Sequence, residues 1–430
     1  MSSTIIVGAG WAGLSCAAAL VKSGHKVTLI DAAPQTGGRA RGVQIKDHIL
    51  DNGQHICLGA YHTLRQMLRE LGLDEQKLFH ILPLSIIIHG TKKIDLRAPS
   101  LSGILLAKNI SWLEKYQLMK FFYRLRKMEF SLQEDCSVLT LLKNYQQSDF
   151  IIKNLWEPLT LAAMTTPITQ ASARVFLKIL SLSFNQGTEN SNWYLPVTDL
   201  SSILPTHISD YLAQHHAEII PSQTIKQLHL VDGKCTGVSS KNKNWQADNI
   251  VLAIAPWQVM PLLEPHPELN STHEMLNNFC YEPITTIYFA FPSEVKLGYP
   301  IVGTLNTTCH WVFDRAFANQ PKIISAVISG PGAHQHLAKD DLADLVLQDL
   351  RALFPHLPKP DWQRVITEKR AAFNCSVQIQ KHRPQAQTAI SNLWLTGDYL
   401  QTGLPATLEG ALLSGRVTAQ NISPRSNQNC

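Results

Sequence analysis

Residues 4–13 read TIIVGAGWAG, an apolar run followed by three glycines, Gly8, Gly10 and Gly13. The run has the composition of a buried parallel strand, and the glycines let the chain turn sharply into a helix while approaching a ligand closely. The start of such a helix carries unpaired N–H groups and the positive end of the helix dipole. The stretch therefore predicts a strand, a turn and a helix that together bind a pyrophosphate.

The residues after the glycines have the pattern that a dinucleotide-binding unit requires. Small residues over 14–23 favour a helix, residues 26–30 form an apolar run typical of a second strand, and Asp31 follows it. An acidic residue about twenty positions beyond the glycines can accept hydrogen bonds from a ribose. The alternative is a glycine-rich turn without a ligand, which would not require this order of elements.

A second glycine pair indicates which dinucleotide is bound. Residues 32–41 read AAPQTGGRAR and contain Gly38 and Arg39. A tightly bound flavin has a diphosphate and a ribityl chain that continue past the first turn, where glycines admit close approach and Arg39 can neutralise phosphate charge. A simple nicotinamide enzyme does not need this pair. An ordinary polar loop with solvated arginines is the alternative interpretation.

The C-terminal region carries a third pattern. Residues 393–398 read LWLTGD, a strand that ends on Gly397 and Asp398, and residues 402–415 read TGLPATLEGALLSG. Together with the two N-terminal patterns, this region resembles the flavin amine oxidase and phytoene desaturase superfamily. The resemblance implies a Rossmann-type α/β fold in which separated parts of the chain enclose one FAD.

A narrower resemblance rests on short segments spread over nearly the whole chain. In combination they are similar to the squalene-associated FAD-dependent desaturases, the hydroxysqualene dehydroxylase family. That family implies a C30 isoprenoid substrate and a place in squalene and hopanoid biosynthesis. The segments are DNGQHI at 51–56, LGAY at 58–61, LWEPL at 155–159, TP at 166–167, ASA at 171–173, LP at 195–196, DLS at 199–201 and GLPATLEGA at 403–411.

The superfamily resemblance also implies a set of FAD contacts. Asp398 is expected at the ribityl and phosphate portion, the backbone of Thr407 and Leu408 at the flavin pyrimidine edge, and Ile225 at the adenine. Asp31 and Asp398 stand where many relatives carry the longer Glu. The complete expected set is Gly8, Gly10, Trp11, Ala12, Gly13, Asp31, Ala32, Gly38, Arg39, Gly53, Gln54, His55, Ile225, Gly397, Asp398, Ala406, Thr407 and Leu408.

If both ends of the chain hold one FAD, the flavin domain must be assembled from separated segments. We expect it to comprise residues 1–80, 195–262 and 385–423, with short strands over 217–220, 223–231, 233–239 and 245–254 forming a meander beside the Rossmann sheet. A discontinuous α+β substrate-binding domain is assigned to residues 81–194 and 263–384, with strands at 85–89, 93–96, 285–291 and 323–329 and a helix at 340–353. Residues 424–430 are expected to form a disordered tail.

The implied reaction reduces hydroxysqualene to squalene: loss of the allylic hydroxyl group leaves a delocalised cation that receives hydride from N5 of reduced FAD. The hydroxyl group leaves as water only after it has been protonated, so a general acid is required. His55 is the candidate because imidazole titrates near neutral pH, and Asp51 would orient it or hold nearby backbone. Glu157 and Glu409 are alternatives, and a structural role stays open for each of these residues.

Composition limits the class of protein. The chain has 430 residues, of which 45% are apolar and 17% charged, with a net charge of +5, so it can bury a large core. No tract of arginines and aromatics indicates nucleic acid, and His215, His216, His334 and His336 are expected at the surface, so no metal site is predicted. Eight cysteines without a C-x-x-C pair, no charged segment before the first apolar run and no apolar run of eighteen residues favour a cytoplasmic protein.

One segment, residues 99–130, combines six basic and two acidic residues with many apolar and aromatic ones. A basic amphipathic stretch can lie in a membrane interface, with lysines among anionic headgroups. An internal helix pair with a solvated basic face has the same pattern. Both interpretations stay open, and the first fits a substrate delivered from the inner face of the cytoplasmic membrane.

Three hypotheses of function follow. The chain is a flavoenzyme that removes a hydroxyl group from a C30 isoprenoid, a flavoenzyme that desaturates a carotenoid precursor or oxidises an amine, or a prenyl-lipid carrier without flavin chemistry. The carrier is disfavoured because the Gly38-Arg39 and Gly397-Asp398 motifs are intact. The electron donor and the oligomeric state are not indicated by the sequence.

Overall fold

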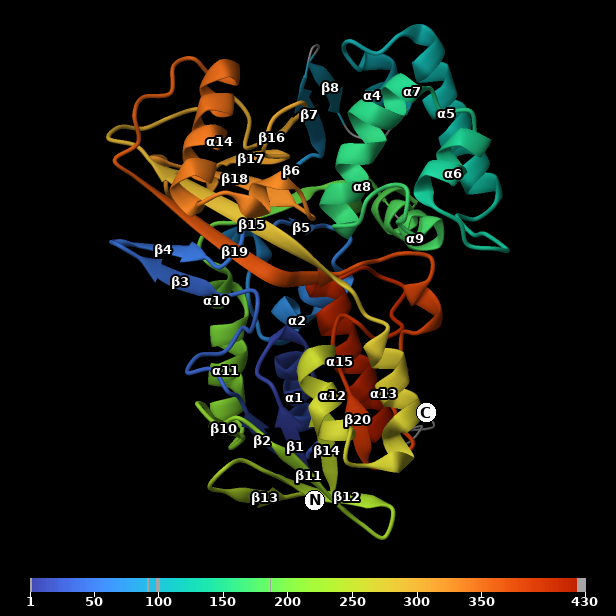
Figure 1. The fold of residues 1–430 in the computed structure, drawn as a ribbon, viewed down its shortest axis with the longest axis vertical. Helices are drawn as coiled ribbons and strands as arrows, with labels where there is room; N and C mark the ends of the chain where they lie inside the picture. The colour runs from blue at the N-terminus through green and yellow to red at the C-terminus, as the bar shows by residue number, and fades with distance from the viewer. Residues whose placement is uncertain (1, 91–92, 98–100, 186, 424–430) are drawn as a thin grey trace.

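The computed structural model describes residues 2–90, 93–97, 101–185 and 187–423. Its lower part contains both ends of the described chain around a parallel sheet, and its upper part contains a larger sheet with a group of helices beside it (Figure 1). The predicted tail, residues 424–430, and residues 99–100 of the basic segment lie outside the described residues.

The parallel sheet takes its strands from separated parts of the chain. Its order is β10, β2, β1, β14 and β20, and every neighbouring pair is parallel. Ile5, Ile6 and Val7 of β1 are all buried, as expected for a central strand covered on both faces. The predicted Rossmann-type α/β fold is confirmed. The five strands span Glu218–Ile220, Lys26–Ile30, Ser3–Val7, Asn249–Leu252 and Leu393–Leu395, respectively.

Helices from the two ends of the chain pack against each other beside this sheet. They are α1 (Trp11–Lys22) and α15 (Leu408–Ile422) (Figure 1). A Cβ atom at Gly415 would lie 2.3 Å from the carbonyl oxygen of Ala12, and Ser15 Oγ donates a hydrogen bond of 2.7 Å to the Leu412 carbonyl. The helices therefore meet at backbone contact, and residues 8–13 and 397–410 are brought together.

The predicted meander is partly wrong. Only β11 (Gln227–Val231), β12 (Lys234–Ser239) and β13 (Asn244–Gln246) form this antiparallel sheet. The expected strand at 245–254 is divided, because Ser3 binds the Asp248 carboxylate and β14 then pairs with β1 and β20. The expected strand at 217–220 is β10, which likewise joins the parallel sheet, beside β2.

The upper part is built on a seven-stranded sheet. Its order is β19, β15, β18, β17, β16, β7 and β8, and all neighbours are antiparallel except β16 and β7. Helix α14 (Lys339–Leu353) covers one face with an apolar cluster, close to the predicted helix. The strands span Trp362–Phe373, Tyr281–Ala290, Ile323–Ser329, Trp311–Asp314, Ile301–Thr304, Ser85–His89 and Ile94–Arg97.

A group of helices lies beside this sheet, at the end of the molecule away from the parallel sheet (Figure 1). The group is held by aromatic contacts, including those of Trp156 with Phe121 and Phe176, whose ring centroids lie 5.5 and 5.8 Å away. The elements are α4 (Leu101–Leu106), α5 (Trp112–Lys127), α6 (Val138–Asn144), α7 (Asp149–Ile151), the π-helical turn η1 (Ile152–Trp156), α8 (Glu157–Met164) and α9 (Ala173–Phe184).

The remaining elements lie in both parts and between them (Figure 1). Hairpin β3–β4 (Gly42–Ile45 and His48–Asp51) is followed by a small sheet of β5, β9 and β6 (Cys57–Leu58, Trp193–Pro196 and Phe79–Leu82). The other helices are α2 (His62–Glu70), α3 (Glu75–Leu78), α10 (Leu200–Ile203), α11 (Pro205–Gln214), α12 (Pro256–Leu263) and α13 (Asn270–Asn277). Short 3₁₀ turns are η2 (Thr188–Ser191), η3 (Pro267–Leu269), η4 (Arg315–Ala318), η5 (Ala333–His336) and η6 (Ile379–Lys381).

Two expectations from composition can be compared with the described residues. Within them, no helix combines the length and the apolar character needed to cross a bilayer. Seven cysteines are described, all as free thiols, and five of them are buried.

Candidate functional site

The first glycine turn lies at the carboxyl ends of adjacent parallel strands. Gly8 donates its backbone N–H to the Ile30 carbonyl at 2.7 Å, and the Ala253 N–H bonds to the Val7 carbonyl at 2.7 Å. The turn is therefore fixed between the ends of β2 and β14, and α1 starts directly after it. This edge of a parallel sheet, at a helix N-terminus, is where α/β folds bind phosphate groups.

The three glycines of this turn are required for different reasons. A Cβ at Gly13 would lie 2.0 Å from the Gly8 oxygen, and one at Gly8 would lie 2.5 Å from the Ala253 oxygen, so both serve contacts within the protein. Gly10 has an ordinary extended conformation, φ −74° and ψ 177°. A Cβ there would come no closer to the surrounding chain than 3.9 Å, to Gly38 Cα. The space beside Gly10 is thus left open, as a bound diphosphate requires.

The second glycine pair is part of the same wall. Gly37 N–H donates to the Ala9 carbonyl at 2.9 Å. Arg41 Nη1 donates to the Gly38 carbonyl at 2.8 Å, while the buried Nε of Arg41 has no hydrogen-bond partner in the described structure. A cationic donor without a partner beside two glycine turns fits the charge of a diphosphate.

Arg39 and Asp398 connect the N-terminal and C-terminal motifs directly. Arg39 Nη2 lies 3.0 and 2.9 Å from the two carboxylate oxygens of Asp398, and its Nη1 donates to the Ala371 carbonyl at 2.8 Å. The charge of Arg39 is thus shared with a carboxylate rather than free for a phosphate alone. The pair places both predicted cofactor residues at one point of the site.

Asp31 is fixed by backbone donors. Its carboxylate oxygens accept hydrogen bonds from Ala9 N at 2.5 Å and Ala33 N at 2.6 Å. Each oxygen keeps a second lone pair, so a ribose hydroxyl can still be bound. Gln223 N–H donates to the Asp31 carbonyl at 2.8 Å, which places the chain leading to Ile225 beside the predicted ribose site. Ala32 lies between Asp31 and Ala33, whose N–H binds the Asp31 carboxylate.

Arg383 organises the C-terminal loop and was missed at the sequence level. It is buried and donates to the carbonyl oxygens of Asp398 at 3.0 Å, of Leu404 at 2.7 Å and of Leu400. It also donates to Thr402 Oγ1 at 3.1 Å. The loop that follows Gly397 therefore closes around one guanidinium group. No local motif marks this arginine, because its partners lie 15 to 21 residues further along the chain.

The start of α15 is held to α2. Thr407 Oγ1 caps α15 by accepting a hydrogen bond from Gly410 N at 3.1 Å, so Ala406 and Leu408 flank the cap. The buried Glu409 carboxylate accepts from Thr63 N at 2.7 Å and Leu64 N at 3.1 Å. Burial raises the pKa of Glu409, and these N–H donors oppose that shift. The structure places Glu409 as an anchor between the two helices.

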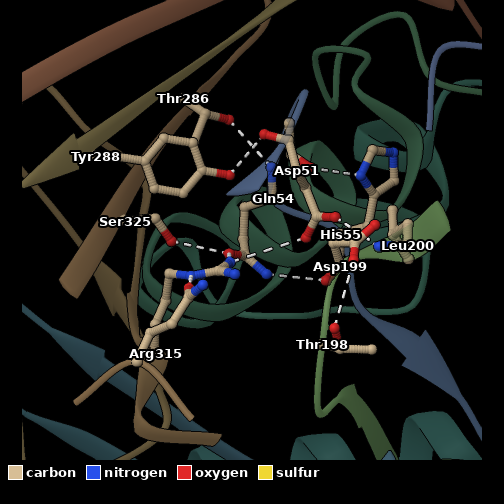
Figure 2. A network of polar contacts seen from close by, with 12 residues as sticks. Asp51, Gln54, His55, Thr198, Asp199, Leu200, Thr286, Tyr288, Arg315 and Ser325 are labelled. Carbon is tan, nitrogen blue, oxygen red and sulfur yellow. Dashed lines mark hydrogen bonds and ion pairs between the residues drawn. The ribbon is translucent and has the colours of Figure 1, made fainter. Parts of the chain in front are cut away.

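Asp51 begins a buried polar network that extends to Arg315 (Figure 2). Its carboxylate accepts from Leu200 N at 2.8 Å and lies 3.8 Å from Arg315 Nη1. Its carbonyl oxygen accepts from the Tyr288 hydroxyl at 2.9 Å. Burial raises the pKa of the Asp51 carboxyl to about 6, although Arg315 and the Leu200 N–H act in the opposite direction.

Gln54 lies in the same network. Its Oε1 accepts from Arg315 Nη1 at 2.5 Å and from Ser325 Oγ at 3.0 Å, and its backbone N–H donates to Thr286 Oγ1 at 3.2 Å. The Gln54 side-chain oxygen and its backbone N–H are thus both occupied by residues of the upper part of the molecule. A Cβ at the neighbouring Gly53 would meet nothing closer than 3.8 Å, so a flat ring can approach the chain there.

His55 is oriented by Gly53 and not by Asp51. Its Nδ1 lies 2.6 Å from the Gly53 carbonyl, which can only accept, so Nδ1 carries the hydrogen and Nε2 is left for other contacts. Burial lowers the pKa of the imidazole, the Gly53 bond opposes this, and the charge of Arg39 lowers it further. Of the two roles considered for Asp51, the structure supports the one that holds nearby backbone, through Leu200.

Two other groups of predicted residues lie elsewhere. Glu157 is exposed at the start of α8. His334 was expected at the surface, but it is buried because η5 folds it against a cavity of about 470 Å³ beside α14, where its Nε2 has no partner in the described structure. This cavity contains none of the glycine motifs. Within the described residues no cluster could hold a metal.

Comparisons with known proteins agree with this geometry. The sequence profile of the family described as flavin containing amine oxidoreductase matches residues 11–423. A hydroxysqualene dehydroxylase of Zymomonas mobilis is 26% identical, covering 97% of this chain and 98% of the relative. A probable zeta-carotene desaturase of Synechococcus elongatus is 22% identical, covering 96% and 97%. A putative protoporphyrinogen oxidase of Exiguobacterium has the same fold, with a TM-score of 0.75, 18% identity and 98% of each chain covered.

We predict that Gly10→Val prevents FAD retention while the chain still folds. The added Cβ lies no closer than 3.9 Å to other protein atoms, and the side chain would extend into the space left for the diphosphate, so we expect FAD binding to weaken about 100-fold or more. Flavin absorbance per purified chain measures the loss, and circular dichroism verifies the fold. Lys22→Val, exposed at the other end of α1, is the control and should stay yellow. A yellow Gly10→Val protein would remove the diphosphate from this turn.

We predict that Asp51 makes stability depend on pH. Its pKa of about 6 lies above the ordinary 3.8, so the folded protein binds a proton that the unfolded chain releases. The contribution of Asp51 to the stability of the folded protein is therefore largest below about pH 4 and decreases as pH rises to about 6. The melting temperature of the wild type minus that of Asp51→Asn should decrease between these values. A constant or increasing difference would contradict the buried assignment; Asp340→Asn, on the exposed side of α14, controls for buffer effects.

Proposed function

This chain belongs to the family of flavin-containing amine oxidoreductases, and we propose that it reduces hydroxysqualene to squalene. It is an FAD-dependent oxidoreductase, with the glycine turns, the Arg39–Asp398 pair and the start of α15 as the cofactor site. The proposed substrate rests on the nearly full-length similarity to a hydroxysqualene dehydroxylase. We accordingly infer a role in squalene and hopanoid synthesis on the cytoplasmic side of a membrane.

In the proposed reaction, one bond of the substrate breaks and another forms at the same allylic system. The C–O bond breaks as the hydroxyl group takes up a proton and leaves as water, and a C–H bond forms at the allylic cation. Reduced FAD, when bound, supplies the hydride for that bond. The protein must therefore donate a proton to the hydroxyl oxygen and keep other water away from the cation.

We propose His55 as the proton donor. Its Nδ1 is occupied by the Gly53 carbonyl, so Nε2 is the nitrogen that would face the hydroxyl group. Asp51 holds Leu200 and Glu409 holds α2, and we propose both as positioning residues for the segment on which His55 lies. Because burial lowers the pKa of His55, its acidic form becomes populated as pH decreases.

An apolar interior supports a hydrocarbon substrate. One continuous cluster of buried residues extends from Phe121 and Trp156 in the helical group to Phe373 and Tyr399 beside Asp398. We assign residues 81–194 and 263–384, which supply most of this cluster, to substrate binding. Residues 1–80, 195–262 and 385–423 are assigned to FAD.

The proposal is tested with reduced protein in the absence of oxygen. The yellow protein is reduced with dithionite and mixed with hydroxysqualene, and flavin reoxidation is followed with product analysis. In parallel, the oxidised protein is mixed with phytoene or an amine, which would give hydride to FAD, and loss of the yellow colour is followed. We expect hydroxysqualene alone to reoxidise the flavin, with one squalene formed per FAD. If hydroxysqualene leaves the reduced flavin unchanged and phytoene or an amine reduces the oxidised flavin, the proposal is replaced by a desaturase, which the zeta-carotene desaturase similarity favours second, or by an amine oxidase.

We predict that His55→Ala retains FAD and lowers turnover about 100-fold, the usual contribution of general acid catalysis. The wild-type rate should increase as pH decreases toward the lowered pKa of His55, and this dependence should be absent in the variant. His55→Gln, which keeps a hydrogen-bonding side chain of similar size, is the matched control and should also be slow. An unchanged rate or pH profile in His55→Ala would assign the proton to another group.

A further inference from the structure

The largest exposed apolar side chains gather at one place. We name this place, formed by α4, α5 and the loop between them, the α4–α5 surface. It contains the five most exposed large apolar residues of the described chain: Leu106 at 77%, Trp112 at 74%, Tyr123 at 69%, Leu113 at 67% and Tyr116 at 57%. A concentration of large exposed apolar side chains on two neighbouring helices indicates an interaction site.

The α4–α5 surface is held in a fixed shape by its own hydrogen bonds. Lys115 Nζ donates to the Leu105 carbonyl at the end of α4 at 2.7 Å and lies 4.7 Å from the centre of the Trp112 ring. Ser111 caps α5, and Glu114 accepts from its backbone N–H at 2.8 Å. These hydrogen bonds hold the end of α4 and the start of α5 in place, so little conformational entropy is lost when the exposed side chains bind a partner.

The two faces of α5 differ sharply. Trp112, Tyr116 and Tyr123 recur at the spacing of one helix face, and Lys120 and Lys127 lie on the same stripe. Phe121 and Leu125 on the opposite side are buried against the core. Trp and Tyr rings mixed with lysines on one exposed stripe are the composition of a membrane–water interface.

Charge decides between a lipid bilayer and a second copy of the chain. Residues 105–127 contain six basic residues and one acidic residue, a net charge of +5, which equals that of the whole chain. Two copies docked through this face would bring these charges together, whereas anionic headgroups would neutralise them.

We propose that the α4–α5 surface docks the protein onto an anionic lipid bilayer, with Leu106, Trp112 and Leu113 entering the acyl boundary and the lysines contacting headgroups. The surface lies at the end of the molecule opposite the parallel sheet (Figure 1). The buried side of α5 contacts Trp156 through Phe121 and Phe122, so the helix that meets lipid also borders the apolar interior. The inference rests on the proposed function only in that a C30 substrate dissolves in such a bilayer.

The experiment measures flotation of the FAD-loaded full-length protein with vesicles of phosphatidylcholine, with or without about 30% phosphatidylglycerol. We expect binding to the anionic vesicles, weakened by salt. Leu106→Gln and Trp112→Gln should each bind about tenfold less, and Lys120→Gln with Lys127→Gln should lose the preference for phosphatidylglycerol. Ile49→Gln and Val231→Gln replace side chains of 52% and 55% exposure elsewhere and should bind like the wild type.

Each outcome either supports or overturns the docking surface. Equal flotation of the α4–α5 variants and the wild type, or no flotation at all, would overturn it. A dimer in sedimentation without lipid that Trp112→Gln abolishes would assign the face to a second copy. Turnover of detergent-dissolved hydroxysqualene should be unchanged in these variants, which separates a failure of docking from a failure of the proposed function.

Discussion

The backbone contact between α1 and α15 is the constraint on which the site depends. Gly415 allows the two helices to approach until the Ala12 carbonyl lies where a side chain would otherwise stand. Helices that meet this closely cannot slide or rotate without overlap of backbone atoms. The first and last motifs of the chain are therefore fixed relative to each other, and the proposed cofactor site depends on this packing.

Polar contacts then fix the loops that this packing brings together. Arg39 pairs with Asp398, Glu409 caps α2, and Arg383 binds three carbonyl groups of the loop after Gly397. Each bond joins segments far apart in the chain and is buried or half-buried, where an unpaired partner would be costly. The same arrangement leaves open space beside Gly10 and Gly53, where an added Cβ would lie no closer than 3.8 Å to other protein atoms.

The upper part of the molecule contributes in a different way. Tyr288 and Ser325 of its sheet, together with Arg315 of η4, hold the segment from Asp51 to Gln54. Its helices supply apolar volume and an exposed basic corner. In the proposed function, cofactor binding and substrate binding are divided between the two parts of the molecule, with His55 on the segment between them.

The sequence by itself determined the Rossmann turn and the parallel strands at 4–7 and 26–30, because these depend on local glycine spacing and apolar runs. Only the tertiary structure decided the role of Arg383, the orientation of His55 by Gly53, the burial of His334 and the division of the strand expected at 245–254. These features depend on partners distant in the chain or on a backbone carbonyl, and neither leaves a local pattern of residues. Exposure of the apolar residues on α5 was likewise a tertiary result, since the same helical pattern fits a buried pair.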